Sequence, residues 1–228
     1  MNIDLVIMAG GEGRRLDPLT RIVPKPLLYM EDKTMLEHVI EFFREQGVGK
    51  VYILTKYKSD LIRSFIQCSG LKDIEVITED EPLGTAGGLS LIGDRLSSLF
   101  FVSNCDVMVD VDLKEFRDSC EADGIDMGII AFSKAVRVPY GIFEFDDDGE
   151  LSDFLEKPNI QLWANAGVYL MTHKVFEYIH PGVRMGMDEL FYNMINSGSN
   201  IRVVPVDGGS FKDIGEFQYY KKVLEELC

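Results

Sequence analysis

The first apolar run of the chain ends directly in a glycine-rich segment, and this junction constrains the fold more than any other feature. Residues 4–9 read Asp-Leu-Val-Ile-Met-Ala, which is typical of a short buried strand, and Gly10, Gly11 and Gly13 follow at once. Glycines after a strand let the backbone turn tightly and bring its N–H groups against an anion. The sequence therefore predicts a first strand that leads into a phosphate-binding loop.

The first half of the chain continues as an alternation of strands and helices. Short β-branched runs alternate with stretches whose apolar residues recur at helical spacing, and Ser59 is the expected N-cap of the second helix. We predict strands over 51–54, 74–77 and 100–102 and helices over 35–46 and 60–67. This alternation favours a parallel sheet covered by helices.

The second half contains strands in closer succession, and the Asp146–Gly149 turn predicts a hairpin. Asp110 and Asp112 are expected in the cap region of a helix, and Trp163 and the methionines in the core. We predict strands over 127–132, 141–145, 151–156, 166–171 and 201–206 and helices over 188–196 and 216–227. The expected fold is a single-domain, Rossmann-like α/β/α sandwich with a mixed, mostly parallel sheet, spanning residues 1–228.

Charge and cysteine content narrow the classes of function. The formal net charge is −15, and so acidic a surface repels nucleic acid and anionic membranes, so neither is an expected partner. The four cysteines show no Cys-x-x-Cys pair, and we expect reduced, buried thiols rather than disulfides or a zinc site. With Asp4 near the start and no apolar run of about 20 residues, a cytoplasmic protein without a signal peptide is expected.

An anionic substrate needs a local cluster of positive charge in such a chain. Arg14 and Arg15 lie in the glycine loop, and Lys25 is held between Pro24 and Pro26. Guanidinium and ammonium groups are strong partners for phosphate oxygens. The alternative is a glycine-rich connector with solvated basic residues. The combination of glycines, two arginines and a proline-flanked lysine favours phosphate binding.

Six short motifs are spread along the chain. They are AGGEGRRLDPLT at 9–20 with PKP at 24–26, EPLGTAG at 81–87, NCD at 104–106, EKP at 156–158, NAG at 165–167 and DIG at 213–215. Together, and in this order, they resemble the signature of the sugar-1-phosphate nucleotidyltransferases, particularly the mannose-1-phosphate guanylyltransferase-like group. The resemblance implies an enzyme that joins a nucleoside triphosphate to a sugar-1-phosphate, releases pyrophosphate, and supplies a nucleotide sugar for cell-surface polysaccharide.

The resemblance also implies a role for each motif. The implied nucleotide-binding residues are Ala9, Gly10, Gly11, Gly13, Arg14, Glu79, Gly84 and Thr85, all in a nucleotide-binding half at 1–110. The implied sugar-phosphate-binding residues are Tyr140, Gly141, Glu156, Lys157 and Asn165, in the half at 111–228. The implied catalytic residues are Arg15, Lys25, Asp106 and Lys157. A single Mg²⁺, held by Asp106 and Asp213, is the implied cofactor.

The metal assignment is chemically reasonable for this pair of carboxylates. Asp106 ends an apolar strand at the edge where open α/β sheets bind ligands. Mg²⁺ commonly takes one or two carboxylates, and phosphate oxygens and water complete its shell. The alternative is that Asp106 and Asp213 are ordinary loop aspartates. No general base is needed, because a sugar phosphate is already ionised at neutral pH.

Glu79 suggests which base is bound. A carboxylate just before the Gly84–Gly87 element could accept hydrogen bonds from guanine N1–H and its amino group, whereas thymine and uracil offer a single N–H donor. GTP is therefore the favoured nucleotide. The alternative is that Glu79 is a solvated residue at a strand end, in the acidic run 79–81.

Three departures from the family pattern and two rival functions remain. Arg14 replaces a small residue, Phe211-Lys212 stands where tryptophan is common, and no hexapeptide-repeat tail is expected. One rival is a cytidylyltransferase for a small non-sugar phosphate such as phosphocholine, which would favour an aromatic cage. The other is a catalytically silent nucleotide-sensing subunit, which would be expected to have lost Arg15, Lys25 or a metal aspartate. The sequence does not determine the sugar, and it allows a homodimer without requiring one.

Overall fold

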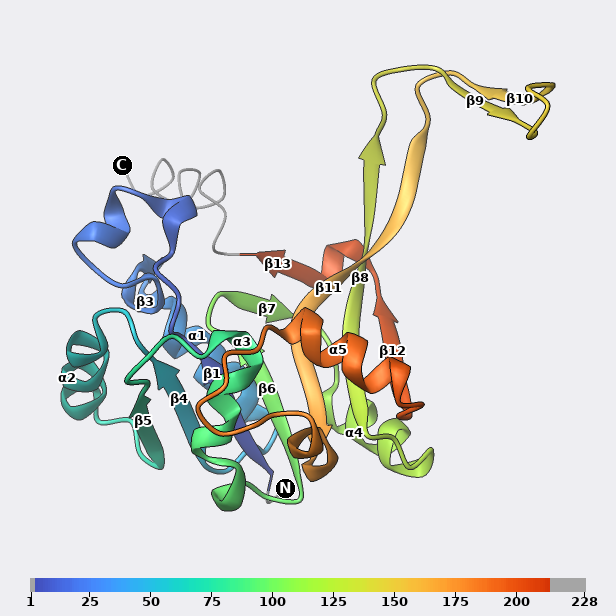
Figure 1. Ribbon diagram of the computed structural model, residues 1–228. Helices are drawn as coiled ribbons and strands as arrows, with labels where there is room; N and C mark the ends of the chain where they lie inside the picture. Colours follow the sequence, from blue (N-terminus) through green and yellow to red (C-terminus); the bar gives the residue numbers. More distant parts are fainter. Residues whose placement is uncertain (1–2, 214–228) are drawn as a thin grey trace.

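The computed structural model describes residues 3–213, and a seven-stranded sheet forms its centre (Figure 1). The strands of this sheet are β1 (Asp4–Met8), β4 (Val51–Thr55), β5 (Ile74–Thr78), β6 (Leu99–Asn104), β8 (Met127–Arg137), β11 (Asn159–Thr172) and β12 (Ile201–Val206). Their order is β12-β8-β11-β6-β1-β4-β5. Only β11 runs antiparallel to its neighbours β6 and β8, so the predicted mixed, mostly parallel sheet is confirmed.

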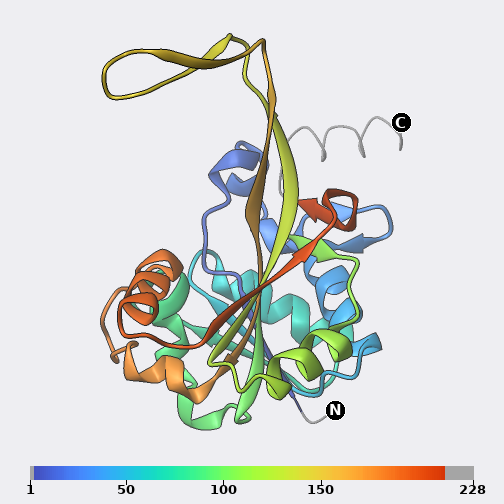
Figure 2. The same ribbon diagram turned by 90° about the vertical axis from the view of Figure 1, so that its right-hand side faces the viewer.

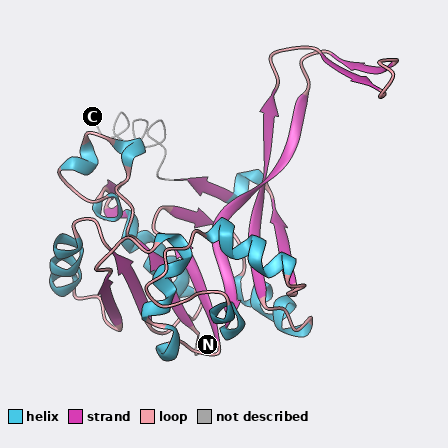
Figure 3. Ribbon diagram, viewed as in Figure 1, coloured by secondary structure: helices cyan, strands magenta, loops and turns pink. Residues whose placement is uncertain are grey.

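Helices cover both faces of the sheet. They are α1 (Met35–Glu45), α2 (Ser59–Ser69), α3 (Gly84–Gly87), α4 (Leu113–Ala122) and α5 (Met187–Asn196). Side chains of β1 alternate between two cores: Leu5 and Ile7 pack with α1, α2 and α4, whereas Val6 packs with α3 and α5. This two-sided burial makes the molecule the Rossmann-like α/β/α sandwich that was predicted (Figure 3).

Short strands and 3-10 helices lie in the segments that connect these longer elements. The short strands are β2 (Tyr29–Met30), β3 (Lys33–Thr34), β7 (Val107–Val109), β9 (Ile142–Phe145), β10 (Leu151–Leu155) and β13 (Phe211–Asp213). The 3-10 helices are η1 (Arg14–Leu16), η2 (Leu19–Arg21), η3 (Lys25–Leu27), η4 (Gly88–Leu91), η5 (Gly93–Arg95), η6 (His173–Glu177) and η7 (Gly208–Ser210). Within residues 3–213, no helix has the length and apolar content required to span a bilayer.

Strands β8 and β11 continue far beyond the sheet as a two-stranded ribbon, which we call the arm and define as residues 133–164. Figures 1 and 2 show the arm projecting from the body, with β9 and β10 at its tip. The predicted hairpin is confirmed: the Asp146 N–H donates to the Glu150 carbonyl at 3.1 Å, and Gly149 takes a φ of 85°. The predicted strands at 127–132 and 166–171 are therefore only the inner parts of β8 and β11.

Several local expectations were wrong. Ser59 is the first residue of α2 rather than its N-cap, and Lys58 precedes it with a φ of 51° and no capping bond. The Trp163 side chain lies on the arm and is 59% exposed, because its strand leaves the core there. Cys68 is exposed, whereas Cys105 and Cys120 are buried as expected.

The expected cap of α4 is confirmed, because the Asp112 carboxylate accepts hydrogen bonds from the Lys114 and Glu115 N–H groups. The predicted helix at 216–227 lies outside the described residues.

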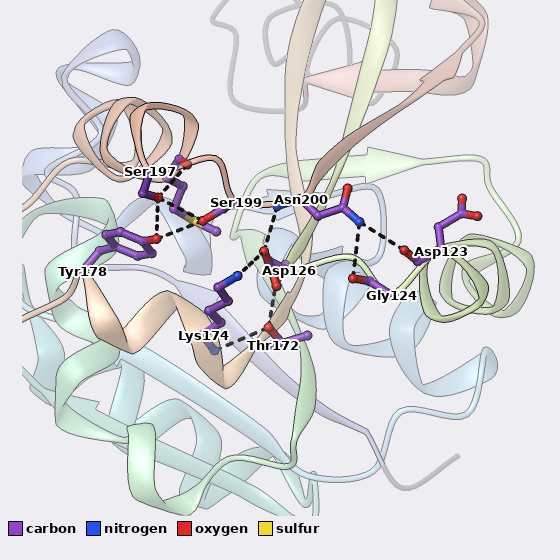
Figure 4. Close-up of polar contacts among 10 residues, drawn as sticks. Asp123, Gly124, Asp126, Thr172, Lys174, Tyr178, Ser197, Ser199 and Asn200 are labelled. Atoms are coloured by element: carbon purple, nitrogen blue, oxygen red, sulfur yellow. Dashed lines mark hydrogen bonds and ion pairs between the residues drawn. The ribbon is translucent and has the colours of Figure 1, made fainter.

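A polar cluster fastens the edge strand β12 to the end of the sheet opposite the arm (Figure 4). The Asp126 carboxylate accepts the Lys174 ammonium at 2.8 Å and the Asn200 backbone N–H at 2.7 Å. The Asn200 amide in turn donates to the carbonyls of Asp123 and Gly124. These bonds fix the turns that precede β8 and β12, and they leave the carboxyl edge of the parallel strands free to form a site.

Candidate active site

Two adjoining cavities open at the carboxyl ends of β1 and β6. The larger, about 540 Å³, is lined by Gly11, Gly13, Arg14, Arg15, Lys25, Thr85, Asp106 and Asn165, among others. The smaller, about 210 Å³, is lined by Gly10, Gly11, Glu79, Gly84 and Thr85, among others. The two share Met8, Gly11 and Thr85. The fold thus brings together most of the residues selected from the sequence, at the edge where open α/β sheets bind ligands.

An ion pair forms the floor of the larger cavity. Asp106 follows β6, and its carboxylate bonds to the ammonium of Lys25, the first residue of η3. The two side chains are only about a tenth exposed. A guanidinium nitrogen of Arg15 lies 3.9 Å from the same carboxylate oxygen, with its side chain 63% exposed. One carboxylate and two cations therefore face the space in which an anionic ligand would sit.

The glycine loop is packed against this ion pair. Gly13 has a φ of 66°, and a Cβ atom there would lie 2.8 Å from Thr20 Cγ2 and 3.0 Å from Lys25 Cβ. The Thr20 hydroxyl donates to the Gly13 carbonyl at 3.2 Å. A side chain at position 13 would therefore displace Thr20 or Lys25 and would also require a backbone conformation that L-residues rarely adopt.

Arg14, the departure from the family pattern, turns outward from the loop. Its Nε lies 2.7 Å from a Glu12 carboxylate oxygen, and its side chain is 87% exposed. The hydrogen bond and the charge of Glu12 raise the pKa of the Arg14 guanidinium. Arg14 still lines the larger cavity, so its cation stands at the rim rather than at the floor.

The smaller cavity is built by two segments that are distant in the sequence. The Ala86 and Gly87 N–H groups both donate to the Met185 carbonyl, at 3.0 and 3.1 Å, and the Met187 N–H donates to the Thr85 hydroxyl at 2.7 Å. A Cβ atom at Gly84, whose φ is 79°, would lie 2.4 Å from the Met185 carbonyl oxygen. Glycine is required at position 84 because the two backbones approach so closely.

Glu79 points into the base of the smaller cavity and is only 6% exposed, so it is not the solvated residue of the alternative reading. One carboxylate oxygen accepts the Leu83 N–H at 3.0 Å. Burial raises the pKa of Glu79, and the Leu83 hydrogen bond and the charge of Lys56 oppose that shift. The carboxylate keeps a second oxygen with which a ligand could bond.

Several predicted residues lie outside these cavities. Tyr140, Gly141, Glu156 and Lys157 are on the arm and do not line either cavity. There Lys157 pairs with Glu156 at 3.3 Å, and both side chains are more than half exposed. Ala9 is 2% exposed and lines neither cavity, and its N–H donates to the Leu54 carbonyl.

Asn165 is the one predicted sugar-side residue in the larger cavity. Its side-chain nitrogen donates to the Tyr169 hydroxyl at 2.8 Å, and its side-chain oxygen accepts the Gly167 N–H at 2.9 Å. Gly167 has a φ of 74° and packs so closely on Asn104 that a Cβ atom would overlap the Asn104 amide. These contacts hold the NAG and NCD motifs against each other.

A divalent cation fits the donors at this site. Among residues 3–213, no group of three or more His, Cys, Asp and Glu side chains gathers to hold a metal unaided. The backbone of Asp213, on β13, pairs with Val107 of β7, and Asp106 lies in the turn directly before Val107, so the two predicted metal-binding residues lie close together along the chain backbone. One or two carboxylates beside a phosphate site is the donor set that Mg²⁺ prefers, with substrate oxygens as the remaining ligands.

Sequence reasoning missed some residues of the cavities. Arg184 and Lys56 place cations on the smaller cavity, and nothing in their local sequence signals this. Cys105 lines the larger cavity, and burial, together with the charge of Asp106, raises its thiol pKa to about 12. Phe211 also lines it and stacks on Phe132 with ring centroids 3.7 Å apart. The sequence analysis identified Phe211 only as a departure from the family pattern, not as a residue of the site.

Sequence comparisons match this chain to known proteins along nearly its whole length. The family model described as nucleotidyl transferase matches residues 5–228. Mannose-1-phosphate guanylyltransferase 1 of Arabidopsis thaliana is 34% identical over 76% of this chain and 51% of that protein. A probable mannose-1-phosphate guanylyltransferase 1 of Oryza sativa subsp. japonica is 32% identical over 94% of this chain and 62% of that protein. The chain spans about half to three-fifths of these curated relatives.

Solved structures share the fold. HddC from Yersinia pseudotuberculosis has a TM-score of 0.76 and 28% identity, and the match covers 99% of this chain and 100% of that one. The same protein has also been solved in complex with GMP-PN, with a TM-score of 0.75. CTP:phosphocholine cytidylyltransferase from Streptococcus pneumoniae has a TM-score of 0.71 at 21% identity, covering 100% of both chains, which supports the fold alone.

Proposed function

The chain belongs to the nucleotidyl transferase family, and from this premise we propose that it transfers a nucleotidyl group from GTP to a sugar-1-phosphate, giving a nucleoside diphosphate sugar and pyrophosphate. The observation that carries the proposal is the larger cavity, where the glycine loop, Arg15, Lys25 and Asp106 converge. The likeness to mannose-1-phosphate guanylyltransferases supports both the substrate class and the base.

The reaction proposed needs alignment and charge neutralisation rather than a protein nucleophile. A phosphate oxygen of the sugar-1-phosphate forms a bond to the α-phosphorus, and the bond from that phosphorus to the bridging oxygen breaks. Pyrophosphate leaves with the electron pair. Arg15 and Lys25 stand where they can hold the phosphates of the nucleotide, and fixed cations of this kind stabilise charge that develops in the transition state.

Mg²⁺ is the proposed cofactor, with Asp106 and Asp213 as its protein ligands. When bound, it would neutralise phosphate charge and draw the reacting oxygens into place. Without a ligand, the Asp106 carboxylate is balanced by Lys25. Lys25 then has a second task in the proposal, because it keeps a buried carboxylate compensated until substrate arrives.

The division of labour proposed from the sequence is retained as part of the function. Residues 1–110 would bind the nucleotide and residues 111–228 the sugar phosphate, in a cytoplasmic enzyme of nucleotide-sugar formation.

The phosphocholine alternative is disfavoured by the residues that line the larger cavity. Of the described residues around the larger cavity, Phe211 alone is aromatic, whereas a cage for a quaternary amine needs several rings.

A panel assay tests the activity. Each nucleoside triphosphate is incubated with each of a set of sugar-1-phosphates and with phosphocholine in Mg²⁺, and pyrophosphate is measured. We expect release with GTP and at least one sugar-1-phosphate. Release only with CTP and phosphocholine would favour the rival enzyme, and no release with any pair would favour the silent subunit.

Glu79→Gln tests the choice of base. The amide presents at most one acceptor to guanine, so we expect GTP affinity to fall about tenfold or more, as for loss of a hydrogen bond to a charged group. Because burial raises the Glu79 pKa, the wild-type preference for GTP should weaken as the pH falls through that raised value. The carboxyl group is then protonated and loses acceptor capacity.

The matched control is Glu81→Gln, an exposed carboxylate two residues away. Calorimetric titration with GTP and dTTP across pH 4.5–8 provides the measurement, the lower limit lying near the ordinary pKa of Glu, about 4.3. Unchanged GTP affinity in Glu79→Gln, or equal affinity of the wild type for GTP and dTTP, would remove the assignment of guanine and leave the transferase proposal standing.

A further inference from the structure

The smaller cavity brings one carboxylate and two cations to a single small space. Glu79, Lys56 and Arg184 all line it, and its volume is about 210 Å³. Pockets that hold a whole drug-sized ligand usually measure about 300–1,000 Å³. The smaller cavity therefore suits one part of a ligand, such as a base, while the adjoining larger cavity holds the phosphates.

The Glu79 carboxylate is held in place at one wall of this cavity. One oxygen accepts the Leu83 N–H at 3.0 Å. The other, Oε1, lies close to two glycines, because a Cβ atom would be 2.7 Å from it at Gly88 and 3.6 Å from it at Gly10. The carboxylate is thus confined between the glycine loop and the start of η4.

Lys56 already serves groups of the protein itself. Its ammonium donates to the Asp80 carbonyl. Its charge also opposes the rise that burial causes in the pKa of Glu79. Lys56 therefore compensates for the buried carboxylate, which leaves Arg184 as the second cation of the cavity to be explained.

The Arg184 side chain is exposed, and its donors are uncommitted. Its guanidinium has neither a hydrogen bond nor an ion pair with any residue in the range 3–213. A guanidinium carries five N–H donors in a rigid planar fork, which suits two acceptors that lie side by side. Arg184 is thus a cation that lines a cavity and has donors available for a ligand.

The backbone on which Arg184 stands is fixed relative to Glu79. Leu83 connects the two segments, because its N–H donates to Glu79 and its carbonyl accepts the Met185 N–H at 2.8 Å. A Cβ atom at Gly87 would lie 2.7 Å from the Val183 carbonyl oxygen, so α3 packs directly on the segment that holds Arg184. The carboxylate and the guanidinium therefore belong to one rigid frame.

This pair of charges complements guanine. The base has two neighbouring donors, N1–H and its amino group, and two neighbouring acceptors, O6 and N7. A carboxylate matches the donors, and arginine is the usual bidentate partner of O6 and N7. Adenine has an amino group in place of O6, which would face the cation, and thymine lacks an acceptor equivalent to N7.

We propose that Arg184 is a second determinant of base choice, whose guanidinium donates to O6 and N7 of guanine while Glu79 accepts from the opposite edge. The inference rests on the function proposed above, in which GTP is the nucleotide. The phosphates are the task of Arg15 and Lys25, which line the larger cavity, whereas Arg184 lines only the smaller one.

Single-atom changes in the nucleotide test the contact by calorimetric titration in Mg²⁺ without sugar-1-phosphate. 7-deaza-GTP lacks the N7 acceptor, and the wild type should bind it at least about fivefold more weakly than GTP. Arg184→Met should weaken GTP binding by roughly 5- to 150-fold, the usual range for a bidentate arginine–guanine pair. In this variant GTP and 7-deaza-GTP should bind equally.

Inosine triphosphate, which lacks the amino group, separates recognition from a structural role. Arg184→Met should keep its preference for GTP over inosine triphosphate, because Glu79 still accepts from the amino group. Glu79→Gln should show the reverse pattern, with the preference for GTP over 7-deaza-GTP retained. Arg184→Lys keeps the charge without the planar fork and should recover only part of the affinity.

The matched control is Arg202→Met. Arg202 is an exposed arginine on β12 that lines neither cavity, so all three nucleotides should bind this variant as they bind the wild type.

The outcomes distinguish this inference from the proposed function. Equal wild-type affinity for GTP and 7-deaza-GTP would overturn the role of Arg184, and so would an unchanged preference in Arg184→Met. Loss of both preferences in Arg184→Met would overturn it too, because the residue would then only support the cavity. In these cases pyrophosphate release from GTP on the substrate panel would leave the transferase proposal standing. A wild type that bound no GTP would overturn both.

Discussion

Asp106→Asn is expected to lower turnover by a factor on the order of 10²–10³, the usual cost of losing one charged contact that stabilises a transition state. Asn keeps the shape of the side chain and an oxygen that can accept from Lys25, so the fold should remain intact. The missing negative charge should weaken Mg²⁺ binding. The measurement is steady-state turnover as a function of Mg²⁺ concentration, with circular dichroism as the check on folding.

Asp110→Asn is the matched control, because Asp110 is an exposed carboxylate just after β7, four residues along the chain. It should leave both turnover and the Mg²⁺ dependence unchanged. If Asp106→Asn turned over at the wild-type rate with an unaltered Mg²⁺ dependence, the assignment of Asp106 as a metal ligand would be wrong. An equal loss in Asp110→Asn would point to a general effect of surface charge.

Lys25→Met is expected to lower turnover by a similar factor, about 10²–10³, because it removes a cation fixed beside the reacting phosphates. Methionine fills most of the volume of the lysine side chain. It leaves the nearly buried Asp106 carboxylate without its ammonium partner, so the free energy of unfolding should also fall, by about 1–3 kcal/mol. Urea denaturation measures the stability, and steady-state assays the turnover.

A double variant distinguishes the two effects of Lys25→Met. Adding Asp106→Asn removes the uncompensated charge, so stability should recover while activity stays lost. Lys114→Met, at an exposed position on α4, is the control for the substitution itself. If Lys25→Met were as stable and as active as the control, the Lys25–Asp106 pair would have no role in the site.

The body of the fold could be predicted because its signals are local. A β-branched run followed by glycines fixes β1 and its loop, and the Asp146–Gly149 turn fixes the hairpin. The arm could not be predicted, because alternating apolar residues indicate a strand without indicating whether it stays within the sheet. Trp163 was assigned to the core for that reason. The cap of α2 was misjudged because Lys58, not Ser59, is the residue outside the helix.

The residues of the site also fall into those with a local sequence signal and those without one. Arg15, Lys25 and Asp106 follow from motif chemistry, since each lies next to a strand end or a rigid turn. Glu79 is held in its buried position by the hydrogen bond from the Leu83 N–H. Arg184 reaches the smaller cavity because the neighbouring Met185 carbonyl accepts hydrogen bonds from α3. Contacts between distant segments of this kind leave no mark in the local sequence.

The fate of the α-phosphoryl group of GTP decides between transfer and every other use of this site. GTP labelled at that phosphorus is incubated with Mg²⁺ and the sugar-1-phosphate that gives the most pyrophosphate, and the products are separated and weighed by mass spectrometry. We predict the label in a guanosine diphosphate sugar, formed in an amount equal to the unlabelled pyrophosphate and strongly reduced in Asp106→Asn. Label recovered as GMP, or GTP left unchanged with every sugar-1-phosphate, would contradict the proposed function.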